Sequence, residues 1–171
     1  MILDFPTHFP EGLERVGGKP TYFIAALWRA VLHGITMNAD QFIQISVTLS
    51  DQDKRLINTI APKIHTLRKD EENIWHAGMI IEAVTNAGTP QERPILPEVP
   101  CISTQKLQIC HYSKEMYGNR APDIQVDDIR MTPQAVEQMA LNDGFECVED
   151  FFAYFNKDWK GKIIHLTDFR Y

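Results

Sequence analysis

Cysteine is scarce in this sequence, and the scarcity excludes a disulfide framework. The three cysteines, Cys101, Cys110 and Cys147, are odd in number and lack C-x-x-C spacing, so we expect reduced thiols. The six histidines are scattered, and none pairs with another histidine or a cysteine at zinc-ligand spacing. We therefore expect neither a metal nor another cofactor.

Long apolar runs and a surplus of positive charge are also missing. No apolar run approaches the ~20 residues that cross a bilayer. The opening MILDFPTHFPEG has acids and prolines where a signal peptide has basic residues and an apolar block. These absences predict a cytoplasmic protein without a membrane partner. The formal net charge of −6 disfavours an extended duplex as partner, but it is compatible with a nucleotide or a short single-stranded RNA.

What the chain does contain is the material of one globular domain. Its 171 residues are 44% hydrophobic and 23% charged, which is enough apolar material for a core. We find no repeat, low-complexity tract or linker, so residues 1–171 are expected to form a single domain. Nothing in the sequence sets the oligomeric state.

Three segments have the apolar spacing of helices. The first lies within 17–34, where apolar residues recur at every third or fourth position. The second, within 131–144, has Thr132 as N-cap, Pro133 at the first helical position and Gly144 as terminator. The third covers 147–159, with Phe151, Phe152, Phe155 and Trp159 on one side.

Other segments alternate apolar and polar residues, as half-buried strands do. The clearest covers 42–50, and further candidates are 64–68, 79–85, 99–112, 124–129 and 162–169. The proline-rich stretch 86–100 is expected to be a loop or an edge connection. Five to six mostly antiparallel strands with helices before and between them predict an α+β protein, built as a small barrel flanked by helices.

The stretch APKIHTLRKD places a lysine, a threonine and an arginine at K-x-x-T-x-R spacing. If 64–68 is a strand, Thr66 and Arg68 share one face, because residues two apart point the same way. Lys63 joins them only if it precedes the strand, on the turn that Pro62 sets. Such a trio is typical either of a small polar pocket or of an ordinary solvated strand face.

Asp143 is the second polar residue in an unusual place. It follows the second predicted helix, where the helix dipole disfavours a carboxylate by roughly 0.3–1 kcal/mol. A nearby cation would offset that cost. The alternative is turn chemistry, since Asn142, Asp143 and Gly144 are all residue types that favour turns.

Three motifs in order resemble the ASCH family, a branch of the PUA-like barrel proteins. PKIHTLR looks like the signature strand of the family, and WHAGMIIEAV is similar to the segment that follows it. The third motif, MALNDGFECVEDFFAYF, resembles the A-x-x-E-G-F of the family and the short helix that follows it. In addition, the closing DWKGKIIHLTDF is similar to the last strand of the family. The resemblance spans about residues 60–169 and implies the PUA-like barrel. Residues 35–60 then look like an insertion that is atypical of the family.

The resemblance implies a pocket between barrel and helices that takes a nucleobase or a nucleotide. The ligand-binding residues would be Lys63, Thr66, Arg68 and Asp143. Trp75 lies in the apparent loop ENIWHAG beside the signature strand. It could stack on a base, which contributes ~1–3 kcal/mol, or simply pack in the core.

Some small members of the family hydrolyse N4-acylated cytidines. Carried over to this chain, the resemblance makes Lys63 a general base, Thr66 a nucleophile and Asp143 the orienting carboxylate. Asp143 is one methylene shorter than the glutamate of the family, and the chain is longer than those hydrolases. Three functions stay open in this order: binding of RNA or a modified nucleotide, hydrolysis of acylated cytidine, and a protein-interaction or inhibitory role.

Overall fold

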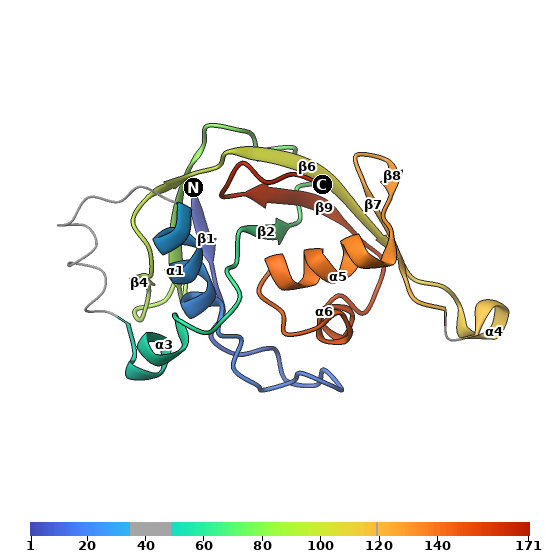
Figure 1. The fold of residues 1–171 in the computed structure, drawn as a ribbon, viewed down its shortest axis with the longest axis horizontal. Helices are drawn as coiled ribbons and strands as arrows, with labels where there is room; N and C mark the ends of the chain where they lie inside the picture. Colours follow the sequence, from blue (N-terminus) through green and yellow to red (C-terminus); the bar gives the residue numbers. More distant parts are fainter. Residues whose placement is uncertain (35–48, 119) are drawn as a thin grey trace.

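The computed structural model describes residues 1–34, 49–118 and 120–171, and shows an α+β protein with two sheets. The larger sheet is antiparallel throughout, in the order β2-β9-β6-β7-β8 (Figure 1). Its strands are β2 (His65–Arg68), β6 (Ser103–Cys110), β7 (Asp123–Val126), β8 (Ile129–Arg130) and β9 (Trp159–His165).

The smaller sheet is mixed. Its central strand β3 (Ile80–Thr85) runs parallel to β1 (Ile2–Asp4) and antiparallel to β4 (Arg93–Pro94) and β5 (Val99–Pro100). The last two strands are short and contain prolines, which lack the N–H that a central strand must donate. The proline-rich stretch 86–100 is therefore a connection that pairs with β3 through these two short strands.

Five helices are described: α1 (Phe23–Gly34), α3 (Asp51–Leu56), α4 (Lys114–Tyr117), α5 (Pro133–Asn142) and α6 (Val148–Tyr154). In Figure 1, α5 and α6 lie together beside the larger sheet, and α1 lies beside β1. Helix α4 sits at the tip of an arm that projects from the body between β6 and β7. None of the described helices is long and apolar enough to cross a membrane.

One face of the larger sheet is buried against the core. On β6, Gln105, Leu107 and Ile109 are buried, whereas Lys106 between them is exposed. This alternation follows from the period of two in a strand. Residues of α5 and α6, such as Met139 and Phe151, belong to the same core cluster.

The local predictions that rest on caps and periodicity are confirmed. Helix α1 fills the predicted three turns, and α5 begins after Thr132, whose hydroxyl accepts the Ala135 N–H. Gly144 follows α5 with a φ of +87°, in the left-handed region that the terminator requires. Strands β2 and β3 fall within the predicted segments 64–68 and 79–85.

Other boundaries were predicted wrongly. The segment 124–129 is a hairpin rather than one strand, because Asp127 and Asp128 adopt φ values of +48° and +68° in a two-residue turn. The third helix ends at Tyr154, since Trp159 already pairs in β9 with Ile109. The segment 99–112 divides into β5 and β6, and the last strand ends at His165 instead of continuing to residue 169.

Short elements without a strong period were missed. These are β1, α3 and α4. The predicted strand at 42–50 falls almost wholly on residues 35–48, outside the described residues, as does most of the expected insertion 35–60. Within the rest of that range lies α3, whose first turn is capped by Ser50.

Gly161 offers a test of how tightly β9 lies against β2. A methyl group at this position would overlap the backbone carbonyl of Arg68 and the ring of Trp159. Because the obstacle is backbone, Gly161→Ala should lower the free energy of unfolding by about 1–3 kcal/mol. Urea denaturation measures the change, with Lys160→Ala at the exposed neighbouring position as control. Equal stability of the two variants would contradict this packing.

Candidate functional site

Strand β2 lies at an edge of the larger sheet, and its free side is covered by the end of α5. The Ile64 N–H, just before β2, donates to the Asn142 carbonyl over 3.0 Å. The Leu67 N–H donates to the carboxylate of Asp143. Residues 142–143 therefore satisfy donors that an edge strand would otherwise expose.

A buried ion pair joins this edge to α1. The Lys63 Nζ donates to both the carboxylate and the backbone carbonyl of Asp143. The two residues are only 1% and 4% exposed, and the ammonium lies 4.4 Å from the centre of the Phe23 ring. The Lys63 N–H donates to the Ala26 carbonyl of α1 over 2.9 Å. Lys63 is thus enclosed between α1, β2 and α5.

The pKa values of the pair reflect this burial. Loss of water lowers the pKa of Lys63 to about 8, although Asp143 attracts its proton. Burial likewise raises the pKa of Asp143, against the attraction of Lys63. Both shifts have the same cause, because a medium of low dielectric constant disfavours each charged form.

Gly144 allows the ring of Phe23 and the side chain of Lys63 to lie close to the backbone at the end of α5. A Cβ built on Gly144 would lie 3.1 Å from Phe23 Cδ1 and 3.3 Å from Lys63 Cδ. Any larger residue would have to displace the lysine stem, in addition to adopting the positive φ.

Arg68 lies at the other end of β2. One of its terminal nitrogens donates to the Asp4 carbonyl over 2.7 Å, and its guanidinium lies 5.0 Å from the centre of the Phe5 ring. Its Nε is buried and has no hydrogen-bond partner among the described residues. Burial lowers the pKa of Arg68, whereas the charge of Asp143 and the hydroxyl of Tyr154 raise it. Arg68 therefore belongs to the same electrostatic cluster as the pair.

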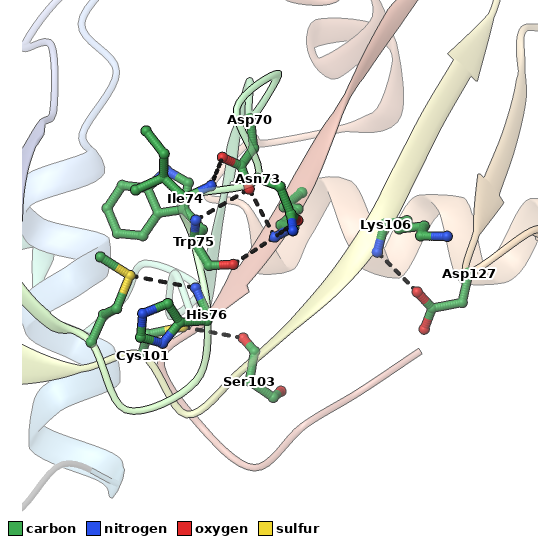
Figure 2. Close-up of polar contacts among 11 residues, drawn as sticks. Asp70, Asn73, Ile74, Trp75, His76, Cys101, Ser103, Lys106 and Asp127 are labelled. Carbon is green, nitrogen blue, oxygen red and sulfur yellow. Dashed lines mark hydrogen bonds and ion pairs between the residues drawn. The ribbon is translucent and has the colours of Figure 1, made fainter.

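Two of the predicted site residues, Thr66 and Trp75, are not part of this electrostatic cluster. Thr66 is buried on the same side of β2 as Arg68, with Ile164 opposite it, and none of the described hydrogen bonds joins its hydroxyl to Lys63. Trp75 is 7% exposed and part of the core. The backbone N–H of Trp75 donates to the carboxylate of Asp70 over 3.2 Å, and the backbone carbonyl of Trp75 accepts from the Lys162 ammonium over 2.5 Å (Figure 2). Its ring therefore lacks the exposed face that base stacking would need.

A cleft of about 480 Å³ opens beside Arg68, and we call it the Arg68 cleft. The end of β2 forms one wall and residues 154–159 form the other. Its exposed or half-buried polar and aromatic residues are Arg68, Lys69, Tyr154, Asn156, Lys157, Asp158 and Trp159. Of these residues, only Arg68 was predicted from the sequence to belong to the site.

At the opposite end of β2, a polar cluster lies under Tyr171. It contains two fully buried histidines, His65 and His165, which face each other across β2 and β9. No pattern in the sequence indicated a role for these two residues. The sequence does not show that His65 pairs with His165, because β2 and β9 are far apart in the chain. Among the described residues, no group of three or more His, Cys, Asp or Glu side chains is placed to hold a metal ion.

Comparisons with protein-family models, curated proteins and solved structures give no match to this chain. The likeness to the ASCH family therefore rests on the sequence motifs.

The ion pair can be tested by a double-mutant cycle. Lys63→Met leaves the Asp143 charge buried without its partner and should cost about 3–5 kcal/mol of unfolding free energy. Asp143→Asn, which still accepts the Leu67 N–H, should also destabilise because it leaves Lys63 without a counter-charge. The double variant should cost much less than the sum of the two, as measured by urea denaturation. Additive effects would show that the two groups do not interact.

The two buried histidines predict that stability falls in acid. Burial lowers the pKa of His65 well below its usual value and that of His165 to about 4. Between pH 6.5 and 4 the unfolded chain therefore binds more protons than the folded chain, so stability is full above pH 6.5 and is lost as the pH falls. The unfolding equilibrium constant should rise about tenfold or more over this range.

Guanidinium denaturation at a series of pH values measures this effect. His165→Gln removes one titrating ring and should flatten the pH dependence, whereas the exposed His76→Gln should leave it unchanged. If the unfolding free energy of His165→Gln depends on pH as steeply as that of the parent chain, this account is refuted.

Proposed function

We propose that this chain is a PUA-like barrel domain of the ASCH type that binds a nucleobase-containing ligand, an RNA end or a modified nucleotide, in the Arg68 cleft. The observation that carries the proposal is the composition of the cleft, where three cations, one carboxylate and three aromatic rings line a space of about 480 Å³. That volume lies within the range of about 300–1,000 Å³ that small-molecule sites occupy.

Each part of a nucleotide has a counterpart in the cleft. The exposed ammonium groups of Lys69 and Lys157 suit a phosphate. The half-buried rings of Tyr154 and Trp159 suit a base, since stacking contributes ~1–3 kcal/mol per base. The exposed amide of Asn156 supplies both a donor and an acceptor for a base edge. The cleft therefore combines the three contacts that nucleotide recognition requires.

The charge of the whole chain favours a short ligand. With a net charge of −6, the protein repels a polyanion at long range, and the cations of the cleft act only locally. A mononucleotide or a short single strand presents few phosphates and meets little of that repulsion.

The buried pair acts electrostatically on the cleft wall. The Asp143 carboxylate raises the pKa of Arg68, against the effect of burial, and so favours the charged guanidinium. The Lys63 ammonium has the opposite effect, because it and Arg68 carry like charges.

A second candidate function is hydrolysis of N4-acylated cytidine, and the pKa of Lys63 favours it. A value of about 8 leaves part of Lys63 neutral at physiological pH, as a general base requires. Lys63 would take the proton of the Thr66 hydroxyl, whose oxygen would attack the acyl carbonyl. Cytidine would leave with a proton from Lys63, and water would then hydrolyse the acyl-threonine ester. This route requires Lys63 to turn from Asp143 toward Thr66.

Calorimetric titration with 5′-CMP tests the proposal. We expect saturable binding that weakens about tenfold or more in a Lys69→Ala, Lys157→Ala double variant, because two phosphate contacts are lost. The matched control is Lys106→Ala, Lys160→Ala, which removes two cations from a different groove on the larger sheet. If both double variants bind 5′-CMP equally weakly, the lysines act only through the overall charge of the protein and not through contacts in the cleft. If the parent chain does not bind 5′-CMP at all, the proposal is refuted.

The same samples distinguish the second function. Incubation with N4-acetylcytidine should release cytidine and acetate only if the chain is a hydrolase, and Lys63→Met should then abolish the release. Binding without product formation would leave the chain as a binding protein.

A further inference from the structure

A groove of about 470 Å³ lies on the open face of the larger sheet, and we call it the sheet groove. Strands β6 and β9 form its floor. The loop after β2 lies on one side of this floor and the turn after β7 lies on the other, as the strand order requires. The groove is separate from the Arg68 cleft, because the two share no lining residue.

Two cations in the groove have no ion-pair partner among the described residues. Lys106 stands directly opposite Lys162 where β6 pairs with β9, and Lys160 lies two residues along β9 on the same face. Like charges that face each other across two strands destabilise a sheet. Lys162 forms an ion pair with Asp70, whereas the described ion pairs include neither Lys106 nor Lys160. The chain therefore compensates only part of this repulsion.

The paired lysine, Lys162, belongs to a fixed wall of the groove. Its ammonium lies 2.8 Å from the carboxylate of Asp70 and donates to the side-chain oxygen of Asn73 over 2.7 Å. The Trp75 carbonyl is its third partner. The same carboxylate of Asp70 accepts the Ile74 N–H over 2.7 Å, which fastens the loop to the lysine (Figure 2). Because an ammonium has only three N–H groups, Lys162 has none left for a ligand. A ligand in the groove therefore meets Lys106 and Lys160.

The exposed carboxylates of the groove stand on its two flanks. Glu71 lies in the loop after β2, next to β9, and Asp128 lies in the turn after β7, next to β6. Across the sheet the charges therefore run negative, positive, positive, negative, with Lys160 and Lys106 at the centre. A complementary ligand has two anionic groups at its centre and cations at its ends. A nucleic-acid strand is anionic throughout, so it would meet a carboxylate on each flank.

The spacing of the two central lysines matches that of a peptide chain. Diagonal neighbours on a sheet, such as Lys106 and Lys160, lie about 7–8 Å apart. In an extended peptide, residues two positions apart lie about 6.6 Å apart and point the same way. Acidic side chains at positions i and i+2 would thus each meet one lysine. Gln108 and Gln125, which pair across β6 and β7, supply amide donors and acceptors beside them.

We propose that the sheet groove binds an extended segment of a partner protein that carries acidic residues at positions i and i+2 and basic residues at i−2 and i+4. The acidic pair compensates Lys106 and Lys160, and the basic residues meet Glu71 and Asp128. All four side chains point to the same face of the segment, because their positions differ by two. This interaction does not rest on the proposed nucleotide binding, since it uses other residues and another ligand.

Fluorescence anisotropy with labelled peptides tests the proposal. The peptide KSETESK, with fluorescein at its N-terminus and an amide at its C-terminus, has the proposed pattern and should bind saturably. The double variant Lys106→Ala, Lys160→Ala should bind it at least tenfold more weakly, because both contacts to the acidic pair are lost. The matched control Lys69→Ala, Lys157→Ala removes two cations from the Arg68 cleft and should leave the affinity unchanged.

Two further peptides test the charge and the spacing separately on the parent chain. KSQTQSK lacks the two acidic groups, and KSEETSK has them at adjacent positions, which point to opposite faces of an extended chain. Both should bind at least tenfold more weakly than KSETESK. This comparison needs no variant, so it decides the question even if the double variant does not fold.

Four results would overturn the proposal. They are a parent chain that does not bind KSETESK, equal weakening by the two double variants, equal affinity for KSETESK and KSEETSK, and displacement of the bound peptide by an oligouridine of seven nucleotides. The last result would assign the groove to nucleic acid instead of protein.

Failure of this site and failure of the Arg68 cleft can be told apart. Binding of 5′-CMP should depend on Lys69 and Lys157, and binding of the peptide on Lys106 and Lys160. Each double variant is therefore the control for the other ligand, and either dependence can fail while the other holds.

Discussion

The ion pair between Lys63 and Asp143 joins parts of the chain that no strand pairing connects. Lys63 enters from the residue before β2, Asp143 from the end of α5, and the ring that covers the ammonium from α1. Both charges lose their water, so each is tolerable only while the other is present. The end of α5 also supplies the hydrogen-bond acceptors that the free edge of β2 would otherwise lack. The pair therefore fixes the position of β2, whose end forms one wall of the Arg68 cleft.

The two ends of β2, a strand only four residues long, have different surroundings. The Arg68 cleft at one end has three cations and one carboxylate, and suits a ligand that carries a phosphate. The polar cluster under Tyr171 at the other end contains two buried histidines, and burial lowers the pKa of both. The strand therefore separates an open, cationic surface from a buried, neutral one.

Burial gives Lys63 two properties that oppose each other. It brings the pKa toward the range of a general base, and it also separates the amine from any open cleft among the described residues. A hydrolase would have to expose the lysine during its cycle, whereas a binding protein can keep it buried as support. The burial of Lys63 therefore favours binding over hydrolysis.

The sequence by itself determined the features that depend on a few neighbouring residues. The cap Thr132, the terminator Gly144 and the apolar periods of α1, β2 and β3 act within one turn or one strand, so their patterns are readable in the chain. It also drew attention to Lys63, Arg68 and Asp143. Only the tertiary structure decided that Trp75 is buried, that the segment 124–129 turns back, and that His65 meets His165 beneath Tyr171. A pattern shows which face of an element is apolar, but burial and pairing depend on what covers that face, and the covering residues come from distant parts of the chain.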